Sequence, residues 1–141
     1  MGDYCSDWRN VISGIQQGFS LGFLLFVIFI NDLPEVATNF IKLFADDTKP
    51  VAVVKNLMDS VSLQNDINAV TKWADDWHMK FNNEKSKVMY IRKKSNNNIY
   101  KHRYTIYVQD LHEPMAERDL GIVITNNLDW EIQCQKTKLY S

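Results

Sequence analysis

Two adjacent carboxylates, Asp46 and Asp47, follow a mostly apolar run and are the first candidates for chemistry. Asp adopts turn geometry readily, so the pair could close a turn between two strands. Carboxylate oxygens are also preferred ligands of Mg²⁺ and Ca²⁺, so the pair could hold a cation. The same tripeptide, Ala-Asp-Asp, recurs at residues 74–76 and provides an internal comparison.

The first copy is expected at the tip of a hairpin. Residues 39–45 and 51–54 are rich in β-branched and aromatic side chains, which predicts two short strands. Pro50 donates no ladder hydrogen bond, so the second strand should begin after it or lie at an edge. An uncompensated carboxylate at the end of a packed sheet is costly, and a cation would relieve that cost. Because successive strand side chains point to opposite faces, Asp46 or Asp47 could bind an ion alone.

The second copy is expected on an amphipathic helix that begins after an N-cap at Asp59 or Ser60. Asp75 and Asp76 fall off the apolar face, where two carboxylates cost little. The hairpin copy is therefore the better candidate for a cation site. The apolar positions that recur at helical spacing are Leu63, Ile67, Val70, Trp73, Ala74 and Trp77.

An uncharged stretch, residues 11–30, is long enough to span a bilayer, and its glycines recur every four residues. The continuous apolar part covers only residues 21–30, a length typical of a core helix that is buried on all sides. Asn31, Asp32 and Pro34 should end that helix.

The remaining residues predict strands at 87–93, 104–108 and 119–124, with Gly121 at a bulge or a close backbone approach. A helix, a hairpin, a second helix and further strands indicate an α+β fold.

Composition limits the kinds of site and the cellular compartment that we expect for this chain. Two distant cysteines, Cys5 and Cys134, and three isolated histidines match neither a disulfide framework nor a structural zinc site, which indicates a reducing, intracellular compartment. The formal net charge of -1 hides a basic segment at residues 80–103, in which aromatic side chains are interleaved. Such a segment suits a nucleic-acid backbone with base stacking, or simply a solvated hairpin surface.

Four blocks, in order, resemble the reverse transcriptase of non-LTR, LINE-type retrotransposons of the jockey-like sort. Residues 8–34, WRNVISGIQQGFSLGFLLFVIFINDLP, resemble the family's Ser-Gly-Val-Pro-Gln-Gly-Ser block and following helix, and residues 42–49, KLFADDTK, resemble its metal-binding hairpin. Residues 81–89, FNNEKSKVM, resemble the Asn-x-x-Lys-Ser/Thr block, and residues 119–130, DLGIVITNNLDW, resemble the primer-grip region. Because the blocks cover nearly the whole chain, the match is more specific than any one of them.

The resemblance implies a partial polymerase palm at residues 1–125, an antiparallel sheet with the Asp-Asp hairpin packed by two helices. Residues 126–141 would be the start of the thumb or connection, or a tail. It also implies RNA-directed DNA synthesis with two Mg²⁺ ions, an RNA template and a DNA primer. The protein would act in the cytoplasm, the nucleus or both.

The family's functional residues carry over by position. Asp46 is the metal ligand of the hairpin, and Asp47 is a weaker or indirect ligand. Gln17 and Gly18, in the same block as Gly14, lie where the family positions template and nucleotide. The position proposed to protonate the leaving group is occupied here by Lys85, and Asn82 shapes its turn.

The chain also departs from the family. Gln16 and Phe19 replace a Pro and a Ser, Phe23 replaces a later Pro, and Pro50 replaces an aliphatic strand residue. In the family, a further catalytic aspartate and the nucleotide-gripping fingers precede the Gln-Gly block, yet here only thirteen residues precede Gly14. We therefore expect an inactive palm fragment whose exposed surface favours self-association.

Two alternatives to a polymerase fragment remain open. The chain could be a non-catalytic nucleic-acid-binding remnant that uses residues 80–103, or a small membrane protein that spans the bilayer at residues 11–30.

Overall fold

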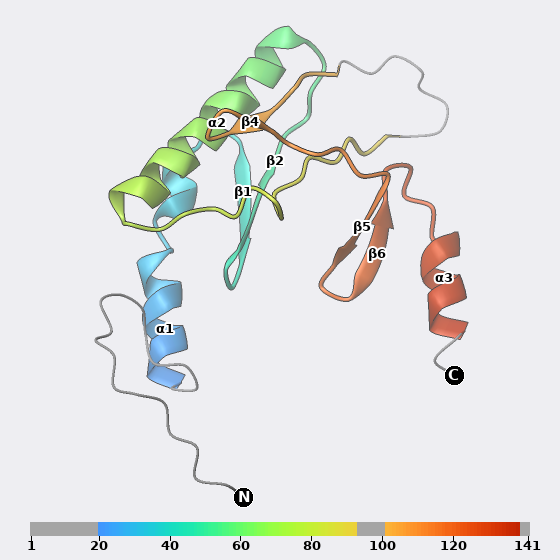
Figure 1. Cartoon of the computed structure of the whole chain (residues 1–141), viewed down its shortest axis with the longest axis horizontal. Helices are drawn as coiled ribbons and strands as arrows, with labels where there is room; N and C mark the ends of the chain where they lie inside the picture. The colour runs from blue at the N-terminus through green and yellow to red at the C-terminus, as the bar shows by residue number, and fades with distance from the viewer. Residues whose placement is uncertain (1–19, 93–100, 139–141) are drawn as a thin grey trace, which may run out of the picture. The chain divides into compact units, whose positions relative to one another are not determined.

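The structure is a computed structural model that describes residues 20–92 and 101–138. The chain divides into two compact units, Met1–Asp32 and Leu33–Ser141. In Figure 1 the colour follows the chain from its N-terminus to its C-terminus. Helices and short antiparallel strand pairs make up the described residues, so the predicted α+β class is confirmed.

In the first unit, α1 (Ser20–Phe29) ends before the predicted stop at Asn31. The expectation that this helix is buried on all sides is wrong, because Phe23 is 64% exposed and Ile28 is 62% exposed. The described part of the unit contains no second helix or strand that could cover an apolar helix. Within the described residues no helix has both the length and the apolar character needed to cross a bilayer.

The second unit begins with a 3₁₀ helix, η1 (Leu33–Val36), followed by β1 (Phe40–Phe44) and β2 (Asp47–Val51). The two strands pair antiparallel, from Phe40 opposite Val51 to Phe44 opposite Asp47. β2 therefore starts four residues before the strand predicted at 51–54. Pro50 is accommodated because β2 pairs only with β1 among the described strands, so its other side is an edge.

α2 (Leu57–Asp76) starts earlier than predicted, since Asn56 is the N-cap and not Asp59 or Ser60. The Asn56 side chain accepts from the Asp59 backbone amide, and the Asp59 carboxylate accepts from the Asn56 amide, which forms a capping box. At the other end, His78 has a φ of 57°, and the amide of Met79 bonds back to the carbonyl of Ala74, as in a Schellman motif.

The predicted apolar face of α2 holds for its central turns, where Ile67, Val70, Trp73 and Ala74 are buried. Trp77 is the exception, because it is the C-cap residue and half of its surface is exposed. The helix packs against η1 and the β1–β2 hairpin, and it lies beside that hairpin in Figure 1. Ile41, which lies on the inner face of β1, completes this core with Leu33.

The last part of the chain forms two small hairpins instead of long strands. β3 (Thr105–Ile106) pairs with β4 (Gln109–Asp110), and β5 (Ala116–Asp119) pairs with β6 (Ile122–Thr125). The last element of the described residues is α3 (Glu131–Lys138). Residues 87–93 contribute only a bridge between Lys87 and His112 among their described positions.

The predicted strands at 104–108 and 119–124 are therefore corrected. Tyr107 and Val108 both have positive φ and turn the chain between β3 and β4. Leu120 and Gly121 do the same between β5 and β6, so Gly121 marks a turn. No heavy atom lies within 4 Å of a Cβ built on Gly121, which excludes the expected close approach.

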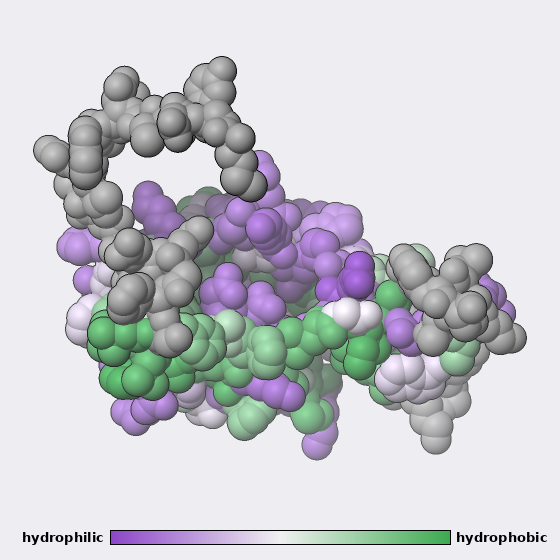
Figure 2. Space-filling view, turned by 90° about the horizontal axis from the view of Figure 1, so that it is seen from below, coloured by the Kyte–Doolittle hydropathy of each residue, from purple (hydrophilic) through white to green (hydrophobic). Residues whose placement is uncertain are grey.

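Apolar side chains also reach the surface. On the outer face of the β1–β2 hairpin, Phe40, Phe44 and Val51 are exposed. Figure 2 shows hydrophobic residues over much of the face it presents.

Candidate functional site

The first Ala-Asp-Asp copy occupies a two-residue turn. Ala45 and Asp46 connect β1 to β2, and Ala45 has a φ of 51°. Asp47 is the first residue of β2 and lies opposite Phe44. Asp46 and Asp47 are therefore consecutive residues at the turn end of the hairpin.

Both Asp46 and Asp47 are exposed to solvent, so the expected cost of an uncompensated carboxylate at the end of a packed sheet does not arise. Among residues 20–92 and 101–138, no side chain forms a hydrogen bond or an ion pair with either carboxylate. Two neighbouring negative charges without a cationic partner repel each other, and a divalent ion would remove that repulsion.

The second copy differs in exactly this respect. Asp76 pairs with Lys72 Nζ at 2.7 Å, and Asp75 Oδ1 accepts a hydrogen bond from the Tyr107 hydroxyl at 3.1 Å. Both carboxylates of the helical copy are exposed, as predicted, and each has a side-chain partner.

The oxygen atoms of Asp46 and Asp47 suit Mg²⁺, which binds through one or two carboxylates together with water and phosphate oxygens. No group of three or more His, Cys, Asp or Glu side chains that could hold a metal occurs among the described residues. The hairpin can thus supply part of a coordination sphere, and further ligands have to come from elsewhere.

Asn82 and Lys85 lie in a tight turn after α2. The side-chain oxygen of Asn82 accepts from the amides of Glu84 at 3.0 Å and Lys85 at 3.3 Å. Its carbonyl accepts from the amide and the hydroxyl of Ser86. The Lys85 side chain is exposed. The three other predicted site residues, Gly14, Gln17 and Gly18, lie outside the described residues.

An ion pair connects the hairpin to β5. Lys49, on the same face of β2 as Asp47, pairs with Asp119 at the end of β5. Both side chains are about one-third exposed, and Asp119 immediately precedes the Leu120–Gly121 turn. This contact holds the β5–β6 hairpin beside the face that carries Asp47.

A buried carboxylate, Asp66, was missed by the sequence analysis. It is 3% exposed and accepts hydrogen bonds from the backbone of Thr38 and Asn39 and from the Asn39 side chain. Burial raises the pKa of Asp66, but these hydrogen bonds outweigh burial and hold the pKa below its ordinary value. A signal was present, because at 3.6 residues per turn Asp66 projects between Val70 and Trp73, on the apolar face.

The basic segment is partly neutralised by acids. Lys87 pairs with Glu117 at 2.7 Å, Lys101 with Glu113 at 2.9 Å, and Arg103 with Asp110 at 3.6 Å. These contacts fit the solvated-surface interpretation and reduce the positive charge that a nucleic-acid backbone would meet.

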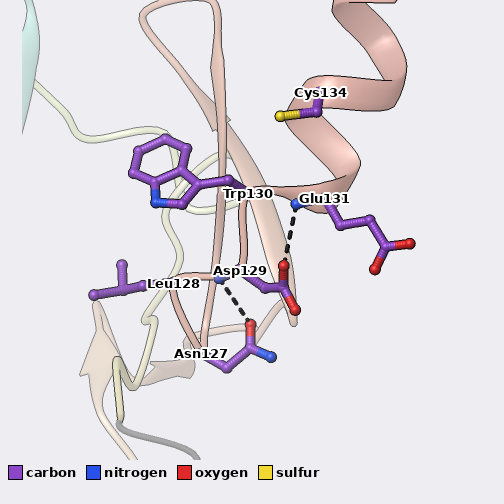
Figure 3. A pocket seen from close by; sticks show the side chains of 6 residues that line it. All are labelled: Asn127, Leu128, Asp129, Trp130, Glu131 and Cys134. Carbon is purple, nitrogen blue, oxygen red and sulfur yellow. Dashed lines mark hydrogen bonds between the residues drawn. The ribbon is translucent and has the colours of Figure 1, made fainter.

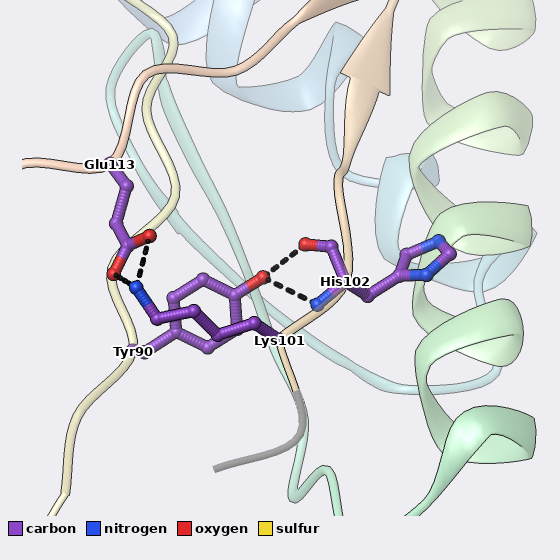
Figure 4. A network of polar contacts seen from close by, with 4 residues as sticks. All are labelled: Tyr90, Lys101, His102 and Glu113. Carbon is purple, nitrogen blue, oxygen red and sulfur yellow. Dashed lines mark hydrogen bonds and ion pairs between the residues drawn. The ribbon is translucent and has the colours of Figure 1, made fainter.

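Tyr90 anchors this segment (Figure 4). Its hydroxyl donates to the carbonyl of His102 and accepts from the His102 amide at 3.2 Å, while Lys101 Nζ lies 5.9 Å from the ring centroid. Burial raises the pKa of Tyr90, so the phenol stays protonated at neutral pH and can serve as donor.

A hollow of about 410 Å³ lies at the start of α3 (Figure 3). Its lining is Asn127, Leu128, Asp129, Trp130, Glu131 and Cys134. None of these is a predicted site residue. Asp129 Oδ1 already accepts from the amide of Glu131, the first residue of α3.

Comparison with known proteins gives two matches. The family described as "Reverse transcriptase (RNA-dependent DNA polymerase)" matches residues 3–136. The RNA-directed DNA polymerase from mobile element jockey of Drosophila melanogaster is 32% identical, over 58% of this chain and 10% of that protein. The chain thus spans about a tenth of the length of this curated relative. No solved structure matches.

The order of sequence blocks and these two matches agree. The family match extends over most of the chain, and the jockey match confirms the predicted resemblance to non-LTR elements. The chain belongs to the reverse transcriptase family, as part of a jockey-like, non-LTR retrotransposon polymerase.

Proposed function

We propose that this chain is the palm segment of an RNA-directed DNA polymerase and that Asp46 and Asp47 are its ligands for Mg²⁺. The observation that carries the proposal is the pair of adjacent, exposed carboxylates at the hairpin turn, with no cationic partner among the described residues. The family of the chain supports the same assignment.

The reaction joins a nucleotide to a primer. The primer 3′ oxygen forms a bond to the α-phosphorus, the bond to the bridging oxygen breaks, and pyrophosphate leaves. Bound Mg²⁺ would supply the activation of the 3′-hydroxyl and the stabilisation of the leaving group. Asp46 would bind the metal ion, and Asp47 would assist in metal binding directly or through a water molecule.

The remaining predicted residues act on the substrates. Lys85, exposed on the turn that Asn82 closes, donates a proton to the departing pyrophosphate. Gln17 and Gly18, with Gly14, position the RNA template and the incoming nucleotide. The DNA primer is the second nucleic-acid partner. The polymerase would act inside the cell, in the cytoplasm, the nucleus or both.

The described residues supply only part of a two-metal site. Two-metal transfer needs carboxylates from more than one strand, and the described residues gather no third acid at Asp46 and Asp47. We therefore expect no primer extension by the 141-residue chain. Magnesium-dependent incorporation that is lost in Asp46→Asn would contradict this expectation.

The metal assignment is tested directly with Mn²⁺, which replaces Mg²⁺ and broadens nearby amide signals in NMR spectra. In the wild-type chain, broadening should centre on residues 45–47 at low Mn²⁺. The double variant Asp46→Asn, Asp47→Asn should lose it. The matched control, Asp75→Asn with Asp76→Asn, should retain it. Broadening centred on residues 74–76, or retained in the first double variant, would reject the assignment.

The exposed apolar residues of α1 also bear on whether copies of the chain associate. A helix whose Phe23 and Ile28 face solvent favours association of copies at micromolar concentrations. We propose that the isolated chain self-associates, and light scattering that finds a monomer would contradict this.

A further inference from the structure

The start of β1 is held by a single buried carboxylate on α2. Asp66 Oδ1 accepts from the Thr38 amide at 2.8 Å, and Oδ2 accepts from the Asn39 amide at 2.8 Å. The Asn39 side chain donates a second hydrogen bond to Oδ2 at 2.6 Å, the third that Asp66 accepts, and also donates to Ser62 Oγ at 3.2 Å. Both carboxylate oxygens are used, and Asp66 is almost completely buried.

These bonds lie immediately before the strand that leads to the candidate metal ligands. Thr38 and Asn39 precede β1, and β1 runs without interruption to the Ala45–Asp46 turn. At about 3.3 Å per residue, the turn lies roughly 20 Å along the strand from this anchor. A two-stranded sheet is marginally stable alone, so its contacts with the rest of the unit decide where its turn lies.

Apart from the Lys49–Asp119 ion pair, which connects β2 to the β5–β6 hairpin, the other contacts of the β1–β2 hairpin constrain its position less. Ile41, on the inner face of β1, is buried and fixes which face of the hairpin points to the core. Apolar burial is non-directional, however, and does not by itself fix the position of a strand along its axis. Hydrogen bonds to two successive amides are directional and do fix it.

We propose that Asp66 is a positioning residue for Asp46 and Asp47: it clamps the first residues of β1 to α2 and thereby sets where the hairpin turn presents its two carboxylates. The functional meaning of this clamp rests on the proposed role of Asp46 and Asp47 as metal ligands. Its structural part, the coupling between the two ends of β1, stands by itself.

The test compares Asp66→Asn with Asp76→Asn, an acid-to-amide change on the same helix at an exposed position. Amide hydrogen exchange is measured residue by residue in the complete chain. In Asp66→Asn, exchange should be about tenfold faster or more at Thr38 and Asn39, because charge-assisted bonds are lost. Exchange should also be faster at Phe44 and Asp47, whereas amides within α2 keep their protection.

A milder variant keeps the test decisive if Asp66→Asn does not fold. Asn39→Ala removes only the side-chain bonds to Asp66 and Ser62, and it should raise exchange at the same positions by a smaller factor. Asp76→Asn should change neither end of β1. The clamp is rejected if Thr38 and Asn39 exchange at the wild-type rate, or if they exchange faster while Phe44 and Asp47 do not.

Mn²⁺ binding provides the functional readout. If Asp66 positions the ligands, Asp66→Asn should weaken Mn²⁺ binding at residues 45–47, and Asp76→Asn should not. Unchanged Mn²⁺ affinity in a folded Asp66→Asn chain would overturn the positioning role. A wild-type chain that binds no Mn²⁺ would reject the proposed function alone, since the exchange data still decide whether Asp66 couples the two ends of β1.

Discussion

The two Ala-Asp-Asp segments show how one tripeptide takes different roles from different surroundings. At residues 45–47 the alanine lies in a turn with positive φ, and neither carboxylate has a partner among the described residues. At residues 74–76 the alanine is buried in a helix, and the carboxylates bond to Tyr107 and Lys72. The carboxylates of both copies are exposed. The presence of side-chain partners, and not the burial of the carboxylates, separates the helix surface from the candidate site.

The largest expected effect separates the two acids of the hairpin. Asp46→Asn should lower Mn²⁺ affinity by about tenfold or more, because it removes a direct ligand. Asp47→Asn should lower it less, and Asp75→Asn should leave it unchanged. Titration of amide broadening with Mn²⁺ measures all three. An equal loss of Mn²⁺ affinity in Asp46→Asn and Asp75→Asn would show that the two Ala-Asp-Asp copies do not differ in metal binding.

Acid should weaken the contact between α2 and the start of β1. The pKa of Asp66 lies below its ordinary value of 3.8 in the folded chain, so its stabilisation is complete above that value and is lost as the pH falls through the folded pKa. At neutral pH, Asp66→Asn should cost about 2 kcal/mol of unfolding free energy. Near pH 2.5 the difference from wild type should shrink.

Urea unfolding followed by tryptophan fluorescence measures this difference at both pH values. Asp76→Asn serves as control, because Asp76 is exposed and its contribution is small at every pH. A difference between wild type and Asp66→Asn that stays constant down to pH 2.5 would show that the charge of Asp66 is not what stabilises the start of β1.

The alanines of the two copies should respond with opposite signs to the same substitution. Ala74 is 2% exposed within α2, so Ala74→Gly should destabilise the fold by about 1–2 kcal/mol through helix propensity and lost burial. Ala45 has a φ of 51°, a conformation that glycine adopts without strain, so Ala45→Gly should stabilise by about 0.5 kcal/mol. Chemical unfolding of both variants measures the two effects. Destabilisation by Ala45→Gly would argue against this turn.

The sequence predicted α2 well because its signal is local and repeated. Buried side chains recur at helical spacing through Ile67, Val70 and Trp73, and Asp75 lies off that face. The start was missed by three residues because Asn56 and Asp59 are both good capping residues, and only the geometry shows that Asn56 is the N-cap.

The short hairpins near the C-terminus could not be predicted from propensity. Tyr107 and Val108 favour strands, yet both have positive φ in the turn between β3 and β4, and Val108 is 97% exposed. Gly121 did mark a change of direction, but the apolar residues around it suggested one continuous strand. The hydrogen bonds of neighbouring segments override the local preference here.

The residues of the candidate site also divide into those that local sequence predicts and those that it does not. Residue types and family resemblance predicted Asp46, Asp47, Asn82 and Lys85 as site residues, and all four lie in or next to turns. The hydrogen bonds of Asp66 are made with residues 27 and 28 positions away in the sequence. Helical periodicity alone does not explain an acid within an apolar stripe. Hydrogen bonds to these distant residues explain why Asp66 lies on the buried face of α2.

The smallest expected effect concerns the helical copy itself. Asp76 and Lys72 form an i,i+4 ion pair whose side chains are 61% and 74% exposed, so Asp76→Asn should change the unfolding free energy by only a few tenths of a kcal/mol. High salt should abolish even that difference, because it screens exposed charges. Urea unfolding at low and at high salt provides the measurement. A cost above about 1 kcal/mol would mean that the helical carboxylates stabilise α2 substantially. The presence of side-chain partners would then not show that the helical copy lacks a role.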